Sequence, residues 1–391
     1  MSRRLALLLL IGAAPPAAEL PEIGSVTLEA DAEARWVPFT LTGSNQIQFA
    51  MSLDGRRVTA ILDTGVSHSV LARASAAFDP ARVRGGGQAS AIGGTVAVGW
   101  QTTGKISLGG LVRQGGEVAV VDLPARATGG GAAVDMLIGR DLTGGHALDI
   151  DYARRRFRLI PSGRLPFAGG SAPLLVSARR QVYESAVTLG ERRLSPMIVD
   201  TGDGAALTVT EAGWRASGVA SPTTSALSYG VAGPVTTGLA VAPAATVGDT
   251  VSGAVEVRIE AADGFSHAVG AAGRIGSGFL QDYRVLLDPG AGRMVLSRRA
   301  GNVVAPARST SGLLLSAASD RLRVVHVMRG GPAATAGWRA GEDICAVDGR
   351  AIGHDDPARP VAAWTTGAPG TTVTLTTCGG ETRRLVLRQF Y

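Results

Sequence analysis

The chain has 391 residues, of which 45% are hydrophobic, so it is long enough for about two to four domains with buried cores. Glycine is abundant (54 residues), β-branched residues are plentiful and only 5% of residues are aromatic, which predicts a mainly β protein with many short strands and turns. The net charge of +6 comes from arginines scattered along the chain, with Lys105 the only lysine. Nucleic-acid binding requires clustered charge, so composition argues against that class of partner.

The N-terminus has the pattern of a secretory signal, predicted over residues 1–19. Arg3 and Arg4 precede the apolar run 5–11, and small residues with prolines follow up to about Ala18. The run is too short to cross a bilayer, and no other stretch has the composition of a membrane span. We expect a periplasmic or secreted protein, the alternative being a disordered or weakly anchored N-terminus. Residues 20–35 are polar and predict a loose leader.

The rest of the chain divides into three predicted domains. Strand-like segments alternate with glycine-rich turns in a first lobe (36–167) and a second lobe (174–299), separated by the Pro/Gly/Ser-rich linker 166–173. A second linker, 302–311, leads to a C-terminal domain over residues 309–391.

The most informative feature is an Asp-Thr-Gly sequence that occurs once in each lobe. Asp63-Thr64-Gly65 and Asp200-Thr201-Gly202 each follow an apolar run that predicts a buried strand. Internal similarity at a fixed offset indicates duplicated units. The offset between the aspartates, 200 − 63 = 137, is the size of a small domain. Two lobes related by a pseudo-twofold axis would therefore bring one aspartate each to a shared cleft.

Further matches keep the same offset. An apolar element ending in glycine follows each aspartate at one spacing, as Ile138-Gly139 in the first lobe (139 − 63 = 76) and Ile275-Gly276 in the second (276 − 200 = 76). Gly93 corresponds to Gly230 at this offset, and the sequence predicts one continuous register between the copies. Two carboxyl groups held close together cannot both ionise, so such a pair shares a proton and can act as acid and base.

These residues give the first 300 positions a resemblance to the retropepsin-like aspartic proteases, with both lobes in one chain. The resemblance implies two β lobes that form a bilobal aspartic endopeptidase, with Asp63 and Asp200 as the catalytic pair. Catalytic-loop support is implied for Thr64, Gly65, Thr201, Gly202, Ile138, Gly139, Ile275 and Gly276. Substrate flaps are implied at Ile92, Gly93, Gly94, Tyr229 and Gly230, although ordinary strand packing is the favoured interpretation of Tyr229 by itself. The substrate would be a peptide or protein, with no cofactor, no metal and no need for a dimer.

Two departures from that family pattern lie in the second lobe. Asp203 places a third carboxylate beside the pair, and Arg274 interrupts the apolar pair before Ile275. Asp203 could bind the substrate backbone, raise the pKa of the pair, or mark a lobe that has lost activity. A catalytically inactive peptide-binding protein is therefore the alternative function.

The C-terminal domain resembles a PDZ domain, through Gly312-Leu313-Leu314 and the segments 331–337 and 341–349. The resemblance implies a small α+β fold whose loop at Gly312, Leu313 and Leu314 binds the C-terminal carboxylate of a peptide. Leu314 stands where the family has a second loop glycine. Cys345 and Cys378, the two cysteines of the chain, could form a disulfide or remain buried thiols.

Other catalytic sets lack their motifs. The histidines show no His-Glu-x-x-His spacing, and His68 is interpreted as a surface or packing residue. Lys105 has no supporting motif for a Ser/Lys pair. Ser277 is the nearest candidate for a serine nucleophile, but the repeat places Arg140 at the corresponding position.

Overall fold

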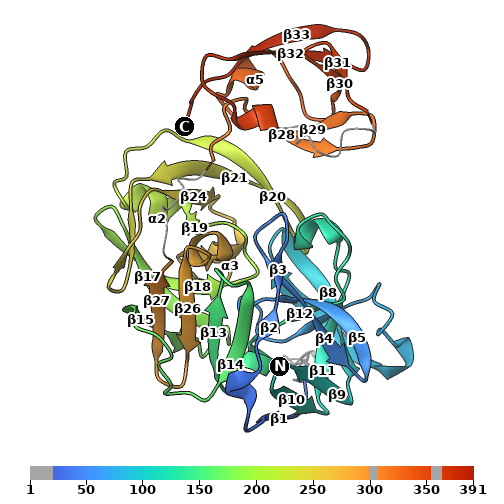
Figure 1. Cartoon of the computed structure of the whole chain (residues 1–391), viewed down its shortest axis with the longest axis vertical. Helices are drawn as coiled ribbons and strands as arrows, with labels where there is room; N and C mark the ends of the chain where they lie inside the picture. The colour runs from blue at the N-terminus through green and yellow to red at the C-terminus, as the bar shows by residue number, and fades with distance from the viewer. Residues whose placement is uncertain (1–20, 300–306, 354–362) are drawn as a thin grey trace, which may run out of the picture.

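The computed structural model describes residues 21–299, 307–353 and 363–391. The predicted mainly β class is confirmed: two β lobes lie side by side, and a smaller β domain lies beyond one end of the second lobe, above β20 and β21 (Figure 1). The predicted signal segment 1–19 lies outside the described residues.

The first lobe is built on an eleven-stranded sheet that includes the strand leading to Asp63. In sheet order its strands are β1 (Ser25–Leu28), β10 (Leu111–Gln114), β9 (Lys105–Leu108), β4 (Ile47–Leu53), β5 (Arg56–Leu62), β12 (Met136–Ile138), β6 (Val70–Ala72), β11 (Glu117–Val121), β8 (Gly94–Thr102) and β7 (Val83–Ala91), with β3 (Thr40–Leu41) paired to β4.

The prediction of a loose leader over residues 20–35 is wrong for β1. This strand pairs antiparallel with β10, from Ser25 opposite Gln114 to Leu28 opposite Leu111. Its residues alternate in exposure, and Val26 and Leu28 pack against the lobe core. The short apolar alternation was hidden within a polar stretch, and a pairing partner far along the chain decides its structure.

The second lobe repeats this arrangement in a ten-stranded sheet. In sheet order its strands are β20 (Thr224–Gly230), β21 (Gly233–Ala242), β24 (Val255–Glu260), β19 (Leu207–Thr210), β25 (Gly273–Gly276), β18 (Arg192–Asp200), β17 (Tyr183–Leu189), β22 (Ala245–Val247) and β23 (Thr250–Val251), with β16 (Leu175–Val176) paired to β17.

Strand pairing shows where the two lobes keep the offset of 137. In the first lobe β12 pairs parallel with β5, with Leu137 beside Ile61. In the second lobe β25 pairs parallel with β18, with Arg274 beside Ile198. Both residues of the second pair follow those of the first at that offset, so Leu137 and Arg274 occupy equivalent positions.

The prediction of one continuous register is wrong between these elements. Val70 pairs with Leu137 and Ala119, whereas Thr208 pairs with Arg274 and Arg258. Val70 is therefore equivalent to Thr208, and Ala119 to Arg258, at offsets of 138 and 139.

The hairpin tips show the same shift. Ala91 pairs with Gly94 at the tip of the first-lobe hairpin, and Gly230 pairs with Gly233 at the tip of the second. Gly93 is thus equivalent to Ala232 rather than to Gly230. The second lobe therefore has extra residues before β19 and before the hairpin tip. It is correspondingly shorter before β25, where the offset returns to 137.

A six-stranded sheet joins the lobes, since β13 of the first pairs antiparallel with β26 of the second. In sheet order its strands are β15 (Gly170–Pro173), β27 (Arg293–Arg298), β26 (Tyr283–Asp288), β13 (Ala147–Asp151), β14 (Arg156–Ile160) and β2 (Val37–Pro38). Part of the predicted linker 166–173 is therefore strand β15, which pairs with β27.

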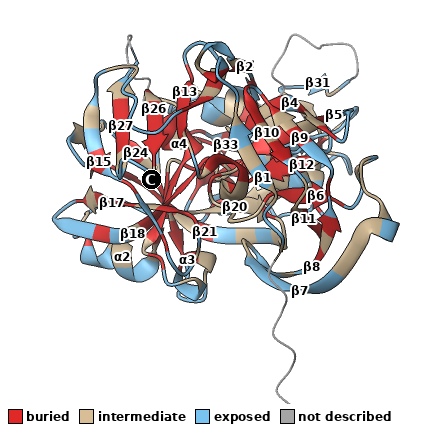
Figure 2. Ribbon diagram, turned by 90° about the horizontal axis from the view of Figure 1, so that it is seen from below, coloured by how far each residue is buried: buried red, intermediate tan, exposed pale blue. Residues whose placement is uncertain are grey.

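Helices are short within the described residues. They are α1 (Arg140–Thr143), α2 (Glu211–Ala216), α3 (Phe265–Ala268), α4 (Ser277–Leu280) and α5 (Pro332–Thr335), and the 3-10 turns η1 (Ala32–Ala34), η2 (Pro80–Arg82), η3 (Ala125–Thr128) and η4 (Ala363–Thr366). No helix in the described ranges has the length and apolar character needed to cross a bilayer. Figure 2 shows the buried strands at the centre of each lobe, with β7 and β8 extending beyond them as half-buried and exposed ribbon.

The C-terminal domain has its own sheet and its own core. In sheet order the strands are β28 (Leu313–Ala317), β29 (Leu322–Val327), β30 (Asp343–Val347), β32 (Thr372–Thr377) and β33 (Thr382–Val386), with β31 (Arg350–Ala351) paired to β30. Its core includes Trp338, Ile344 and Leu375.

This domain packs on the hairpin β20–β21 of the second lobe. The Thr224 hydroxyl donates to the Arg329 carbonyl at 2.7 Å, and the Ser225 hydroxyl lies 2.9 Å from Nε2 of His326. Met328 and Tyr391 bury apolar surface with Leu239 and Val241 of β21. The domain therefore holds one of the two hairpins that the sequence predicts as flaps.

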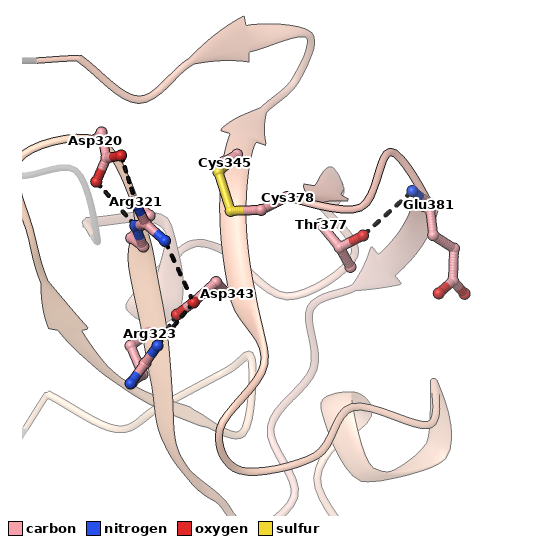
Figure 3. Close-up of a disulfide and its surroundings, with 8 residues drawn as sticks. All are labelled: Asp320, Arg321, Arg323, Asp343, Cys345, Thr377, Cys378 and Glu381. Carbon is pink, nitrogen blue, oxygen red and sulfur yellow. Dashed lines mark hydrogen bonds and ion pairs between the residues drawn. A yellow bond between two sulfur atoms is a disulfide. The ribbon is translucent and has the colours of Figure 1, made fainter.

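The two cysteines form a disulfide within the C-terminal domain (Figure 3). Cys345 lies in β30 and Cys378 directly follows β32, the neighbouring strand, and their Cα atoms are 4.9 Å apart. The bond closes a loop with a sequence separation of 33 residues. The alternative of two buried thiols is therefore wrong.

We expect reduction of this bond to destabilise the C-terminal domain. Closing a loop of this length restricts the unfolded chain, and the chain-entropy relation gives a contribution of about 3.7 kcal/mol. Urea denaturation followed by tryptophan fluorescence, to which Trp338 and Trp364 of this domain contribute, with and without reductant, measures the difference. Cys345→Ala/Cys378→Ala should unfold like the reduced chain and should not respond to reductant. Equal midpoints for oxidised and reduced chains would contradict the expectation.

Candidate active site

The structure brings Asp63 and Asp200 together at the junction of the lobes. Asp63 directly follows β5, and Asp200 is the last residue of β18. Because β5 and β18 are equivalent strands, the two carboxyl groups approach each other across the pseudo-twofold axis. A Cβ atom added to Gly65 would overlap the Asp200 carboxylate, and one added to Gly202 would overlap that of Asp63. Both glycines are required because any side chain would displace the opposite carboxylate.

The threonines after the aspartates lock the two loops to each other. The Thr64 hydroxyl donates to the Val199 carbonyl at 2.7 Å and accepts from the Thr201 amide at 3.0 Å. The Thr201 hydroxyl makes the reciprocal pair with the Leu62 carbonyl (2.7 Å) and the Thr64 amide (3.1 Å). Both side chains are buried, so four hydrogen bonds shielded from water fix the separation of the aspartates.

The carboxylates themselves are oriented by backbone amides. Oδ1 of Asp63 accepts from the Gly65 amide at 3.0 Å, and Oδ1 of Asp200 accepts from the amides of Gly202 and Asp203 at 2.9 and 3.0 Å. The other oxygen of each carboxyl group is free of these amide bonds. The loops thus fix one oxygen of each aspartate and leave the second for the partner aspartate or a bound molecule.

Burial and the charge of a neighbouring carboxylate raise the pKa of both carboxyl groups. Burial, the charge of Asp200 and a hydrogen bond that the protonated Asp63 donates to Asp200 raise the pKa of Asp63 well above its ordinary value. Burial and the charge of Asp203 raise the pKa of Asp200 to about 6, against the opposing effect of Arg274. The pair therefore keeps a proton at a pH where isolated carboxyl groups would be ionised, and titrates as a unit.

The third carboxylate, Asp203, belongs to a buried ionic network centred on Arg274. Nε of Arg274 donates to Asp203 at 2.7 Å, and Nη1 donates to Glu260 at 2.8 Å and to the Ser266 hydroxyl at 3.0 Å. The same Nε lies 3.9 Å from Oδ2 of Asp200. Burial alone would raise the pKa of Asp203, but the charge of Arg274 outweighs it and holds that pKa below its ordinary value. Asp203 is therefore an ionised partner of Arg274.

The apolar elements ending in Gly139 and Gly276 pack against the two loops. Ile138 and Ile275 are fully buried, and the Ile138 carbonyl accepts from the Asp63 amide at 2.9 Å. Gly139 and Gly276 leave no space for a Cβ atom against the backbone of the loops at Val66 and Asp203.

The predicted flap residues meet above the pair. Ile92 and Gly93 form the tip of the β7–β8 hairpin, and the Ala232 amide at the tip of β20–β21 donates to the Ile92 carbonyl at 3.1 Å. Tyr229 reaches across to the first lobe, where its hydroxyl accepts from Nη1 of Arg126 at 3.2 Å and its ring lies under the guanidinium at 5.3 Å. Gly94 opens β8, and Gly230 closes β20. The two hairpins close over a cleft with a volume of about 1330 Å³.

One wall of this cleft is apolar. Its apolar lining residues from the first lobe pack in a single hydrophobic cluster that also contains Ile61. This cluster includes the lining residues Val66, Val70, Val98, Ala119, Val121 and Leu137.

The opposite wall, in the second lobe, is charged and polar at the equivalent positions. Pairing equates Val70 with Thr208, Ala119 with Arg258 and Leu137 with Arg274. Residues two apart on a strand share a face of the sheet. Along the same strands, Glu260 is therefore equivalent to Val121, and Thr237 is equivalent to Val98. Asp203 is equivalent to Val66, because the Asp203 amide donates to the Asp200 carbonyl as the Val66 amide donates to the Asp63 carbonyl. The two halves of the cleft therefore differ in chemistry although they share one fold.

The predicted carboxylate loop of the C-terminal domain lies at the start of β28. The amides of Gly312 and Leu313 already donate to the hydroxyls of Ser309 (3.0 Å) and Ser311 (3.1 Å). Leu313 is buried, whereas the side chain of Leu314 is 40% exposed and lines the cleft between the lobes. A peptide carboxylate would have to displace both serine hydroxyls to bind these amides.

The remaining catalytic candidates have structural contacts. Ser277 is buried, and its hydroxyl donates to the Thr201 carbonyl at 2.9 Å. His68 packs edge-on against Trp100 and lies 3.1 Å from the Ser67 hydroxyl. Among the described residues, no three His, Cys, Asp or Glu side chains are grouped to hold a metal ion.

Several residues of this region were not predicted as site residues from the sequence. Gln46 bridges the lobes by donating to the Gly202 carbonyl at 2.8 Å and the Ala127 carbonyl at 3.0 Å. Arg258, Thr237 and Glu260 line the cleft from the second lobe. The signal for Glu260 and Arg258 was the charged alternation Glu256, Arg258, Glu260 along a strand with buried apolar residues between.

Comparison with known families bears on the first lobe. Residues 49–142 match the model of the aspartyl protease family. The matched segment contains Asp63-Thr64-Gly65, the first hairpin and Ile138-Gly139. A comparison with curated proteins gives no match to the chain. The aspartyl protease match supports a protease with a peptide substrate, and the second lobe contributes the equivalent loop by duplication.

Proposed function

We propose that this protein is an aspartic endopeptidase in which Asp63 and Asp200 activate a water molecule between the lobes. The observation that carries the proposal is the reciprocal arrangement of the two loops, where each glycine lies against the opposite carboxylate and each threonine bonds to the opposite strand. Such precision is needed by a pair of groups that act on one bound water molecule.

The two carboxyl groups differ in the way that acid–base chemistry requires. Asp63, with the more strongly raised pKa, would hold the shared proton, and Asp200 would be the carboxylate. Asp200 would take a proton from the water molecule as the water oxygen attacks the carbonyl carbon of the substrate. Asp63 would donate to the carbonyl oxygen, giving a tetrahedral gem-diol. The proton on Asp200 would then pass to the leaving amine as the C–N bond breaks, and Asp63 would take back a proton from one hydroxyl as the carboxyl product forms.

The hairpins β7–β8 and β20–β21 would act as flaps that cover an extended peptide. Figure 2 shows β7 and β8 projecting from the lobe core, and β7 is largely exposed. Tyr229 would contribute to closure through its contact with Arg126. Because both aspartates belong to one chain, no dimer is needed.

The C-terminal domain would act as a PDZ-like module that recruits substrate or regulates access. Its packing against β20 and β21 supports this role, because a ligand that displaced the domain would also release a flap. The disulfide supports a periplasmic or secreted location, since such bonds persist in oxidising compartments.

A pH series with a mixed peptide library tests the proposal. Catalysis requires one proton on the pair, so the rate should rise with pH as Asp200 ionises, with an acid limb centred at about 6. At higher pH it should fall as Asp63 loses its proton. Products are identified by mass spectrometry, and a statin-type transition-state mimic should inhibit. Tight binding of peptides with no product at any pH would instead support the catalytically inactive peptide-binding protein.

A further inference from the structure

Two buried polar atoms on the charged wall of the cleft have no hydrogen-bond partner among the described residues. They are Oγ1 of Thr237 and Nε of Arg258. Both residues line the cleft, and Thr237 is only 5% exposed. Buried polar groups are nearly always satisfied in folded proteins, so two unsatisfied atoms in one cleft indicate a place where a ligand supplies the partner.

The two atoms belong to one surface. Arg258 of β24 is the direct partner of Leu239 in β21, and Thr237 lies two residues from Leu239 on the same strand. Directly opposed residues of antiparallel strands project to the same face, as do residues two apart, so Thr237 and Arg258 share a face of the sheet. A group bound in this part of the cleft can therefore contact both side chains.

Their chemistry defines the group that would bind. Arginine Nε is only a donor, and a threonine hydroxyl can donate or accept, so an oxygen acceptor satisfies both. The guanidinium charge favours an ionised acceptor. Two further arginines of the second lobe line the cleft, and both are already bonded: Arg274 to Asp203, Glu260 and Ser266, and Arg180 to Glu184. The Nε atom of Arg258 has no hydrogen bond in the part of the chain that the structure describes, and the charge of Arg258 acts only at longer range, lowering the pKa of Asp203 and opposing the burial that raises the pKa of Glu256.

The first lobe shows that these polar residues are not needed by the fold. The equivalent positions carry Val98 and Ala119, which pack in the apolar wall. The same β framework is thus stable with small apolar side chains at both places. A binding role for Thr237 and Arg258 accounts for the difference between the lobes.

We propose that Arg258 and Thr237 form a subsite that binds a carboxylate of the peptide substrate, while the apolar wall of the first lobe binds an apolar side chain. This inference rests on the proposed peptide-cleaving function and names its substrate class. The two unlike walls would fix the direction of the peptide, which a symmetric cleft would leave undetermined. The carboxylate could come from an Asp or Glu side chain or from a peptide C-terminus.

Binding to the Asp63→Asn chain tests the subsite without turnover. The probes are octapeptide pools in which one position is Glu, Gln or Leu, each made with a free and an amidated C-terminus, and the readout is fluorescence anisotropy. We expect one Glu pool to bind about tenfold more tightly than its Gln and Leu counterparts, the size of one charge-assisted hydrogen bond. If the C-terminus is the source, the preference will follow the free terminus instead.

Substitution by the first-lobe residues makes the test specific. Arg258→Ala should abolish the carboxylate preference, Thr237→Val should reduce it, and Arg258→Lys should retain part of it through charge. Arg57→Ala, on the exposed start of β5, is the control and should bind like the parent chain. An unchanged Glu-to-Leu ratio in Arg258→Ala would overturn the subsite. Failure of all pools to bind would overturn the peptide cleft itself. If the ratio is unchanged but the wild type cleaves peptides with the expected acid limb, the subsite fails and the proposed function stands.

Discussion

Asp63→Asn is expected to lower kcat/KM for any cleaved peptide by about 10⁴-fold or more while the chain remains folded. The asparagine amide has the shape of the carboxyl group, and its oxygen can still accept from the Gly65 amide. It cannot hold the proton that the shared pair requires. Initial rates on the best library peptide measure the loss, and Asp79→Asn, at a half-buried aspartate that caps η2, is the control. Turnover within a few-fold of wild type would remove Asp63 from the mechanism.

The same substitution should raise stability at neutral pH. The pKa of Asp63 is higher in the folded chain than in the unfolded chain, so the folded state binds more protons and loses stability as pH rises from about 4 towards the folded pKa. Asparagine does not ionise and removes this loss. Urea midpoints at pH 4 and pH 7 should therefore differ less for Asp63→Asn than for wild type. A larger difference in the variant would contradict the raised pKa.

Arg274→Leu is expected to destabilise the second lobe by about 3–5 kcal/mol, although leucine is the residue at the equivalent position of the first lobe. The substitution leaves Asp203 and Glu260 as buried carboxylates without their shared cation. It also removes the charge that lowers the pKa of Asp200, so the acid limb of any activity should move to higher pH. Urea denaturation and the pH profile measure the two effects.

The matched control replaces the whole network by the residues of the first lobe. Arg274→Leu/Asp203→Val/Glu260→Val should recover most of the lost stability, because a buried ion network exchanged for apolar side chains is often nearly neutral. A triple variant as unstable as Arg274→Leu would mean that the network is not a unit. Stability of Arg274→Leu equal to wild type would mean that the carboxylates are not held as the structure shows.

The residues of the candidate active-site loops could be predicted from the sequence because their constraints are local and occur twice. Asp63 and Asp200 each follow an apolar strand and precede Thr-Gly, and an apolar element ending in glycine follows at the same spacing in both lobes and completes the unit. These short segments keep one fixed offset, and β5–β12 and β18–β25 pair in identical register.

Other features depend on contacts between distant segments. The pairing of β1 with β10 was hidden in a polar stretch, and the wrong equivalence of Gly93 with Gly230 arose because insertions before β19 and the hairpin tip cancel before β25. For the same reason a fixed offset could not equate Arg258 with Ala119. The sequence showed Arg274 as a departure, but only the fold shows that Asp203 and Glu260 bind it.

A double-mutant cycle on the two aspartates tests the central claim most directly. Initial rates of peptide cleavage are compared for wild type, Asp63→Asn, Asp200→Asn and the double variant, all checked for folding by circular dichroism. Two groups that share one proton act as a unit, so each single variant should lose nearly as much activity as the double variant. Losses that add in free energy, or a single variant that retains turnover, would contradict the account.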